Sequence, residues 1–227
     1  MLAVVAGSGI DLLPLLDSVH AELPFAHFPG LTTSTVKGHA SRFVQGDVLV
    51  NGAPVPLLLQ LGRRHAYEGL DYAAVTRPVE VLQQLGATRI LFTNAVGALD
   101  TALRPGMLVA MEACAVWPFR GFPLPERIAP GFMPPGADAA GVNWFMHGPS
   151  YETRAEIAAL QSLGGTTVGM STAPELLRAA ELGLPAGAVS VVTNICGAPG
   201  ELTHTEVVQH AQQASARLRE LVRNMMG

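Results

Sequence analysis

Short apolar runs rich in β-branched residues alternate along the chain with longer stretches whose apolar residues recur every three or four positions. The first pattern is typical of buried strands and the second of amphipathic helices. Strands are expected at Leu2–Ala6, Val55–Gln60, Arg89–Thr93, Met107–Met111 and Ala188–Thr193. Helices are expected near Ala74–Leu85, Thr153–Leu163, Ala173–Leu182 and His204–Met225. This alternation predicts an α/β layer fold.

The segment Arg42–Leu61 has the pattern of two strands joined at Asn51-Gly52, a dipeptide that favours a hairpin turn. A hairpin introduces antiparallel pairing, so we expect a mixed sheet. No linker, repeat or low-complexity tract divides the 227 residues, and 49% of them are hydrophobic, which suffices for one large core. We therefore expect a single domain over residues 1–227.

Three of the expected helices begin with the Thr-x-x-Glu spacing of a capping box. The pairs are Thr153 with Glu156, Thr172 with Glu175, and Thr203 with Glu206. Each pair follows a strand-like segment with polar residues at its end. In open α/β sheets, ligands bind at the connections between the ends of strands and the starts of the following helices. These junctions are the first candidates for a binding site. At the second junction, Ser171 would face an anion held by the helix N-terminus.

The stretch Val116–Gly141 is rich in proline and glycine and carries Trp117, Phe119, Phe122 and Phe132. We expect a long ordered loop here. Long loops in compact domains are often functional. A surface excursion packed by its own aromatic side chains explains the composition equally well.

Composition narrows the function classes. Charged residues make up 14% of the chain, the net charge is -4 and Lys37 is the single lysine, so the basic stripe required for duplex nucleic acid is missing. No run approaches the roughly 20 apolar residues of a membrane span. Cys114 and Cys196 match neither a Cys-x-x-Cys motif nor a disulfide framework, and the apolar start lacks the charged region of a secretory signal. We expect a cytoplasmic protein without a nucleic-acid or membrane partner.

Two segments near strand ends carry groups suited to an anion. Ser8 lies between Gly7 and Gly9 directly after the first strand, where backbone N–H groups can approach a phosphate closely, although Gly-x-Gly is more often only a tight turn. In the segment 62–69, the alternate residues Arg63, His65 and Tyr67 share one face if the backbone is extended, whereas Arg64 points the other way. Arginine offers a planar fork to an oxyanion and histidine adds a donor.

Other polar residues are suited to a flat heterocycle. Tyr151 can stack on such a ring and Glu152 can accept hydrogen bonds from ring N–H groups, although a glutamate near a helix start commonly serves only the helix dipole. Asn194, at the end of a strand, offers a carbonyl and an amide, although isolated asparagines there usually make turns. His204, just inside the last helix, is expected to be neutral, and a lone histidine is more often structural.

Two kinds of catalytic site find no support. The histidines at positions 20, 27, 39, 65, 147, 204 and 210 form no ligand cluster with each other or with cysteine, so we expect no metal. A Gly-x-Ser-x-Gly nucleophile elbow is also missing, which argues against a Ser-His-Asp hydrolase.

Taken together, these segments resemble the trimeric purine nucleoside phosphorylase family, which includes methylthioadenosine phosphorylase. The matching motifs occur in the family's order: Gly7-Ser8-Gly9, Gly38-His39-Ala40, Gly62-Arg63 with His65 and Tyr67-Glu68-Gly69, Thr93-Asn94-Ala95 with Gly97, Gly148-Pro149-Ser150-Tyr151-Glu152-Thr153, Gly169-Met170-Ser171-Thr172 with Pro174-Glu175, and Thr193-Asn194. Each motif is modest alone, but seven in order are specific. The resemblance implies a three-layer α/β/α fold with a central mixed, twisted sheet.

The resemblance further implies reversible phosphorolysis of purine (deoxy)ribonucleosides to the free base and (deoxy)ribose 1-phosphate, in a homotrimer that serves purine salvage. Phosphate is a co-substrate and no cofactor is needed. The phosphate ligands would be Ser8, Arg63, His65, Ser171, the backbone of Ala95, and His39 in a closing loop. The ribose would contact Tyr67, Met170 and His204. The purine would contact Tyr151, Glu152 and Asn194, and catalysis would rest on Asn194, His65 and Glu152.

Asn194 bears on the choice of substrate. In the family, asparagine at this position accompanies 6-oxopurines, while an aspartate form accompanies 6-aminopurines, so we expect inosine and guanosine as preferred substrates. A phosphorylase for methylthioadenosine or methylthioinosine and a non-catalytic nucleoside-binding protein are the alternatives. Intact phosphate-site residues argue against the binding protein, since nucleoside binding alone would not need them.

The chain departs from the family pattern in three places. The sequence starts at the first expected strand, so we expect it to lack the helical N-terminal extension common in the family. Residues 112–143 are shorter than the corresponding family region, which lends an aromatic residue to the neighbouring subunit's ribose site. Phe119, Phe122 and Phe132 are the candidates to replace that aromatic. Ile195 stands where a lysine is common.

Overall fold

The computed structural model describes residues 1–36, 40–118, 121–198 and 204–227, without the side chain of residue 204. The strands are β1 (Leu2–Ala6), β2 (Ser18–Pro24), β3 (Arg42–Val50), β4 (Ala53–Leu61), β5 (Arg89–Ala98), β6 (Leu108–Val116), β7 (Arg127–Ile128), β8 (Ala139–Phe145), β9 (Thr167–Gly169) and β10 (Ala186–Ile195). The α-helices are α1 (Tyr72–Gln84), α2 (Arg154–Ser162), α3 (Ala173–Glu181) and α4 (His204–Asn224). Short 3₁₀ turns cover Leu13–Leu15, Phe25–His27 and Ala66–Glu68.

The described strands form one mixed sheet in the order β10-β6-β8-β9-β5-β1-β4-β3-β2, with β7 paired to β6 outside this order. Strands β1, β4, β5 and β10 are mutually parallel, whereas β3 pairs antiparallel with both β2 and β4. Strand β10 pairs with β5 on one side and with β6 on the other, so β10, β6, β8, β9 and β5 close into a ring of paired strands. The expected mixed sheet is confirmed, and the ring is an addition to it.

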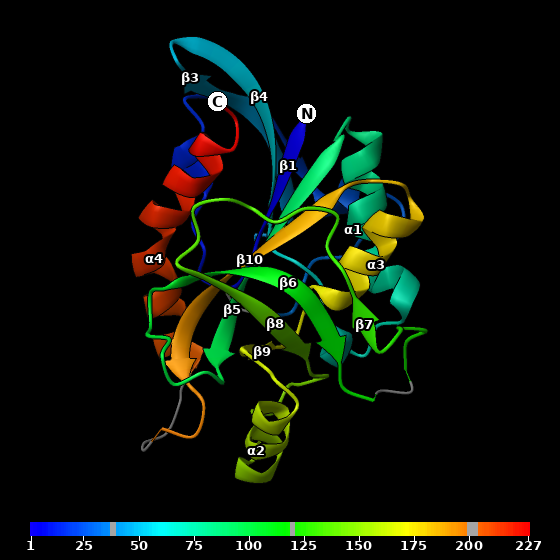
Figure 1. Ribbon diagram of the computed structural model, residues 1–227. Coiled ribbons are helices and arrows are strands. Elements are labelled where there is room, and N and C mark those ends of the chain that lie inside the picture. Colours follow the sequence, from blue (N-terminus) through cyan, green and yellow to red (C-terminus); the bar gives the residue numbers. More distant parts are fainter. Residues whose placement is uncertain (37–39, 119–120, 199–203) are drawn as a thin grey trace.

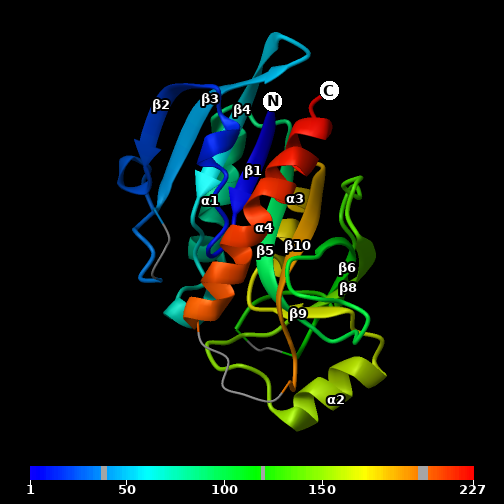
Figure 2. The ribbon, with the colours of Figure 1, turned by 90° about the vertical axis from the view of Figure 1, so that its left-hand side faces the viewer.

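Helices cover both faces of the open half of the sheet, which gives three layers. Figures 1 and 2 show α4 on one face and α1 with α3 on the other, while α2 lies beyond the end of the sheet near β9. Successive side chains of β1 point to opposite faces of the sheet and so pack against both helical layers. Ala3 and Val5 pack toward α1 and α3, and Leu2 and Val4 pack toward α4. Strands buried on both faces explain why the sequence pattern there is continuously apolar.

The predicted strands and helices are all present; the strand at Leu2–Ala6 has the predicted bounds and the others have shifted ends. Strand β5 continues to Ala98 and β6 to Val116, beyond the apolar runs that predict them. The helix expected from Ala74 begins at Tyr72 because Asp71 caps it, with Oδ1 accepting from the backbone N–H of Ala74 at 2.7 Å. Both Thr-x-x-Glu capping boxes that lie within the described residues form, at the starts of α2 and α3. The third, at Thr203, lies outside the described residues.

Strands β2, β8 and β9 lack the pattern that would have predicted them. Strand β2 is an edge strand with mostly exposed residues, β9 has three residues, and β8 begins within the glycine-rich segment expected to be a loop. At Gly141 in β8 a Cβ would collide with Thr166, so the glycine allows the close approach. The expectation that Val116–Gly141 is all loop is therefore wrong at its end, and also at β7 in its middle.

The aromatic residues of this segment pack within their own chain. Phe122 is buried and contacts the ring of Tyr72 edge-on at 5.8 Å. The Phe132 ring lies against Gly187 in β10, and Trp117 packs edge-on against Trp144. Phe119 lies outside the described residues. Each of these three rings therefore packs against another part of the fold, on α1, β10 or β8, and not against another aromatic residue of the segment.

Candidate active site

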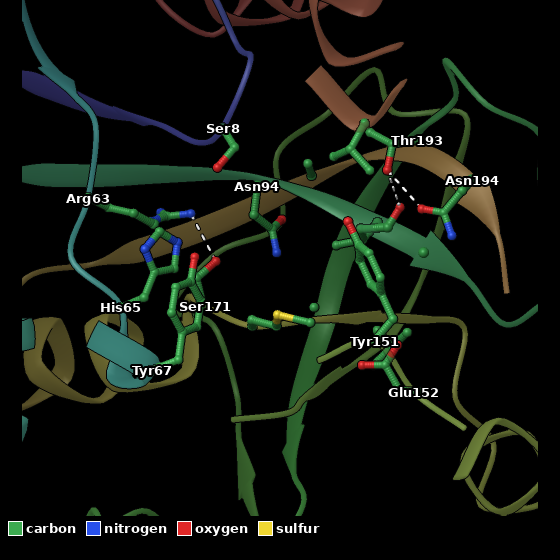
Figure 3. A pocket seen from close by; sticks show the side chains of 17 residues that line it. Ser8, Arg63, His65, Tyr67, Asn94, Tyr151, Glu152, Ser171, Thr193 and Asn194 are labelled. Atoms are coloured by element: carbon green, nitrogen blue, oxygen red, sulfur yellow. Dashed lines mark hydrogen bonds between the residues drawn. The ribbon is translucent and has the colours of Figure 1, made fainter. Parts of the chain in front are cut away.

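A pocket lies at the carboxyl ends of the parallel strands, facing the start of α3 (Figure 3). Because β1, β4, β5 and β10 run the same way, the residues that end or follow them meet at one edge of the sheet. The pocket is lined by Ser8, Arg63, His65, Tyr67, Asn94, Ala95, Val96, Gly97, Tyr151, Glu152, Val168, Gly169, Met170, Ser171, Thr193, Asn194 and Val207.

Every predicted site residue whose side chain the structure describes lines this pocket. These residues are Ser8, Arg63, His65, Tyr67, Ala95, Tyr151, Glu152, Met170, Ser171 and Asn194. His39 and the side chain of His204 lie outside the described residues. Segments more than 180 positions apart in the sequence, such as Ser8 and Asn194, thus share one cavity.

Arg63 is held rigidly at one end of the pocket. Its side chain is 1% exposed, and Nη1 donates to the backbone oxygen of Thr93 at 3.0 Å and to Ser171 Oγ at 3.1 Å. Nε donates to Glu175 Oε1 at 3.3 Å. Figure 3 shows Ser8 and Ser171 around the guanidinium. A buried guanidinium flanked by hydroxyl groups is an anion-binding arrangement.

The turn that carries Ser171 is fixed by Glu175. Oε2 of this buried carboxylate accepts from the backbone N–H of Thr172 at 3.0 Å, while Oε1 faces Arg63. Thr172 has φ of 84°, in a region that non-glycine residues avoid. Such a residue costs about 1–3 kcal/mol and persists only where its surroundings impose it. Glu175 therefore both caps α3 and positions Arg63, a role that the capping pattern alone did not reveal.

His65 is buried beside Arg63 and stacks on Tyr67, with ring centroids 4.6 Å apart and planes 17° apart. Burial lowers the pKa of His65, and the nearby charge of Arg63 lowers it further, although hydrogen bonding to Glu68 partly offsets both. The imidazole is therefore neutral at pH 7. Burial also raises the pKa of Tyr67 to about 12, with help from the charge of Glu68, so its hydroxyl keeps its proton.

Glu68 ties the His65 segment to residues 34 and 35. Oε2 accepts from Ser34 Oγ at 3.1 Å and from the backbone and hydroxyl of Thr35 at 2.9 and 3.1 Å, while Oε1 accepts from the backbone N–H of His65 at 2.7 Å. Burial alone would raise the pKa of Glu68, but the hydrogen bond with the His65 side chain, together with the bonds from Thr35, the His65 backbone and Ser34, outweighs burial and lowers the pKa to about 2. The carboxylate is ionised throughout the physiological pH range.

The opposite end of the pocket carries amide and carboxyl groups. Thr193 Oγ1 lies 3.0 Å from Asn194 Oδ1 and 3.1 Å from the backbone oxygen of Val96, which restrains the amide. Glu152 also lines the pocket, next to Tyr151 in Figure 3, and burial raises the pKa of its carboxyl. Tyr151 is 46% exposed at the rim (Figure 3). These groups can bind a planar ring that has both donors and acceptors at its edge.

Several pocket residues fall outside the predicted set. They are Asn94, Val96, Gly97, Val168, Gly169, Thr193 and Val207. The sequence offered a basis for predicting four of them. Asn94, Gly97, Gly169 and Thr193 belong to the family motifs quoted in the sequence analysis. Val207 reaches the pocket from α4, and nothing local in the sequence of a helix indicates a ligand contact.

The described residues contain no group of three or more histidine, cysteine or acidic residues placed to hold a metal ion. Within the same residues, no helix has the length and apolar character needed to cross a membrane. Cys114 and Cys196 are both free.

Comparison with known proteins agrees with this geometry. The model of the phosphorylase superfamily matches residues 1–140 and 137–226. The purine nucleoside phosphorylase of Mycobacterium tuberculosis is 35% identical over 239 residues, covering 99% of this chain and 88% of that protein. Purine nucleoside phosphorylase 1 of Geobacillus stearothermophilus is 31% identical over 254 residues, covering 99% and 91% respectively.

Solved structures share the fold. The purine nucleoside phosphorylase of Schistosoma mansoni in complex with adenosine superposes with a TM-score of 0.81 at 24% identity, covering 99% of this chain and 89% of that chain. Its complex with inosine gives a TM-score of 0.79 at 22% identity, with coverage of 99% and 88%. From the sequence matches and the shared fold, the chain belongs to the phosphorylase superfamily and, within it, to the purine nucleoside phosphorylases.

Proposed function

We propose that this protein catalyses the reversible phosphorolysis of purine (deoxy)ribonucleosides, preferably inosine and guanosine, to the free base and (deoxy)ribose 1-phosphate. One observation carries the proposal: a single pocket has the buried Arg63 and Ser171 at one end and Asn194 with Glu152 at the other. An anion site and a heterocycle site in one cavity are what a nucleoside and phosphate need in order to react.

The anion end suits orthophosphate. Arg63 offers charge-assisted donors, Ser8 and Ser171 offer hydroxyl groups, and the start of α3 adds a favourable dipole. His65 and the backbone of Ala95 complete the proposed set. A neutral His65 can still donate one N–H to a phosphate oxygen. His39 remains a proposed ligand on the strength of the family resemblance.

The other end suits a purine with a carbonyl at position 6. Asn194 offers a donor and an acceptor, and Glu152 accepts from ring N–H groups when ionised. Tyr151 at the rim is placed to cover the ring. The sugar would lie between the two ends, against Tyr67 and Met170, with His204 as a proposed further contact.

The proposed chemistry needs no enzyme nucleophile and no metal. A phosphate oxygen forms a bond to C1' while the bond from C1' to the purine nitrogen breaks, and its electron pair goes to the purine. The proton that phosphate gives up balances the proton that the purine gains. Positive charge grows on the sugar beside phosphate, and negative charge grows on the purine beside Asn194, so both ends stabilise the transition state.

Release of base from inosine, guanosine, adenosine and methylthioadenosine, with and without phosphate, tests the proposal. We expect phosphate-dependent release, fastest from inosine and guanosine. Release that does not depend on phosphate would refute phosphorolysis. Preference for methylthioadenosine would favour a methylthionucleoside phosphorylase, an outcome for which Val207 supplies an apolar contact in the pocket. No release from any of them would favour a non-catalytic binding protein.

The family resemblance also supports a homotrimer, one domain over residues 1–227, and a cytoplasmic role in purine salvage. The two free cysteines agree with a reducing compartment. Light scattering during size-exclusion chromatography tests the trimer, for which we expect three times the chain mass of 23.8 kDa.

A further inference from the structure

Arg64 is a buried charge that the roles proposed above do not use. Its neighbours Arg63 and His65 line the pocket, whereas Arg64 lies outside the lining, as expected for the residue between them. Charged side chains outside a binding site are almost always solvated. Arg64 is instead only 4% exposed, slightly less than the pocket residue His65 at 6%. Its burial therefore needs an explanation.

Arg64 lacks the partner that a buried charge normally has. Of the two arginines that are buried among the described residues, Arg63 forms an ion pair with Glu175 at 3.3 Å. Within the described parts of the chain, Arg64 has no carboxylate partner: Nη1 donates to the backbone oxygen of Gly30 at the long distance of 3.4 Å, and Nε has no hydrogen-bond partner. Arginine keeps its proton in proteins. Arg64 is thus a full positive charge enclosed by the fold, which costs stability.

The anion end has little other positive charge to offer phosphate. Figure 3 shows Arg63 and His65 together there, but the Arg63 charge is matched by the buried carboxylate of Glu175. Burial lowers the pKa of His65, so the imidazole is neutral. Glu68 is ionised and negative, and hydrogen-bond donors offset its charge. Without Arg64, these groups therefore supply no net positive charge.

We propose that Arg64 supplies the positive charge that holds phosphate at the anion end, although its side chain does not touch phosphate. This inference rests on the proposed function. Arg64 is joined directly to Arg63 and to His65, so its guanidinium lies on the order of 10 Å from a phosphate bound beside them. Across a protein interior of low polarity, a unit charge at that distance changes the affinity for an anion by about tenfold.

The cost of burying Arg64 gives the proposal a second signature. Replacing buried charges by apolar side chains of similar volume is often neutral or stabilising. Removing the Arg64 charge should therefore weaken phosphate binding while the fold keeps or gains stability. A side chain that only supports the structure behaves differently, because its loss lowers stability and affects the binding of both substrates.

Two substitutions remove the charge in different ways. Arg64→Met leaves an unbranched apolar side chain, and Arg64→Gln leaves a neutral side chain that can still donate to Gly30. Arg77→Met is the matched control: Arg77 Nε donates to the backbone oxygen of Pro29 at 3.1 Å, next to Gly30, but its charge is already paired with Glu80 at 2.6 Å. The control thus removes an anchor of the same loop without removing an unpaired charge.

Three quantities are measured for each variant: the Kd of phosphate by calorimetry, the KM values of phosphate and inosine, and the midpoint of urea unfolding. For both Arg64 variants we expect the Kd and KM of phosphate to rise about tenfold, with the KM of inosine unchanged. The unfolding midpoint should stay at the wild-type value or rise in Arg64→Met. In Arg77→Met the midpoint should fall because Glu80 loses a partner, while the Kd of phosphate stays unchanged.

An unchanged Kd of phosphate in both Arg64 variants would overturn the proposed role of the charge. Wild-type phosphate binding in Arg64→Gln alone would assign the effect to the contact with Gly30, and an equal rise of the Kd in Arg77→Met would assign it to the loop. Failure of both Arg64 variants to fold, or equal increases in both KM values with a lower midpoint, would show that Arg64 is a structural residue instead.

The proposed function can fail separately. Wild-type protein that binds phosphate but releases no base would contradict phosphorolysis, and the Kd of phosphate in the variants would still decide the role of Arg64. Phosphate-dependent release by the wild type, with an unchanged Kd in both Arg64 variants, would refute the role of Arg64 alone. Wild-type protein that binds no phosphate would refute both.

Discussion

Replacing Glu68 by glutamine should weaken the fold in a way that depends on pH. The Glu68 carboxylate accepts from the backbone N–H groups of Thr35 and His65 and from the hydroxyl groups of Ser34 and Thr35. Glutamine keeps the length of the side chain but turns one of the two oxygens into an NH₂ group, which meets donors in either orientation. The substitution therefore removes charge and hydrogen bonds together.

The size of the effect follows from the pKa. A carboxyl whose pKa falls from its ordinary value of 4.5 to about 2 on folding contributes ~3 kcal/mol to stability at neutral pH. Because Thr35 is exposed and solvent screens its contacts, we expect about 2 kcal/mol. A lowered folded-state pKa stabilises above the unfolded pKa, so the contribution is complete above pH 4.5 and is lost as the pH falls toward 2.

Urea unfolding of wild-type protein and Glu68→Gln between pH 7 and pH 3.5 measures this contribution. The difference in unfolding free energy should be about 2 kcal/mol at pH 7 and should fall by about half or more at pH 3.5. Glu126→Gln, which also removes one negative charge but at an exposed position, should change little. The KM for phosphate should rise in Glu68→Gln because the His65 backbone loses its anchor.

A difference between wild type and Glu68→Gln that stays constant from pH 7 to pH 3.5 would refute the reasoning. It would mean that the carboxylate is not stabilised in its ionised form by its hydrogen bonds with Ser34, Thr35 and the backbone and side chain of His65. An equal change in Glu126→Gln would show a general charge effect instead.

Three further substitutions test the two ends of the pocket. Ser171→Ala removes the hydroxyl 3.1 Å from Arg63 Nη1 and should raise the KM of phosphate about tenfold, with little change for inosine; equal increases would contradict a phosphate role. Gly97→Ala places a Cβ 2.5 Å from Cys196 Sγ and 3.2 Å from Asn194 Nδ2. Because the added methyl group displaces the Asn194 amide, the KM of inosine should rise more than the KM of phosphate. Unchanged KM values would show that β5 shifts to accommodate the methyl group. Asn194→Asp should shift the kcat/KM ratio from inosine toward adenosine, and an unchanged ratio would remove Asn194 from substrate selection.

Local patterns were enough to predict the strands that meet at the pocket and the capped helix starts. Alternation and β-branched runs identify a strand when it is buried and at least five residues long, as β1 is. The motifs then identified Ser8, Arg63, Ser171 and Asn194, because each stands next to a strand end. Strand β9, with three residues, is too short to leave a pattern.

Long-range pairing left no local signal. The ion pair between Arg63 and Glu175 joins residues 112 positions apart, and Glu175 shows in the sequence only as the end of a capping box. Val207 reaches the pocket because α4 packs on β10, which depends on the whole sheet. The ring of strands could not be predicted either, because the sequence of β10 does not indicate that it pairs with both β5 and β6.

The position of β10 has a consequence for how the protein is made. This strand lies between β5 and β6 in space but follows both by many residues in the chain. It is therefore synthesised well after them. Until then, β5 and β6 each present an unpaired apolar edge, the kind of edge that recruits other chains. The same strand brings Thr193 and Asn194, so closing the ring and completing the pocket are one event, and a nascent chain gains its ligand site only when its exposed edges disappear.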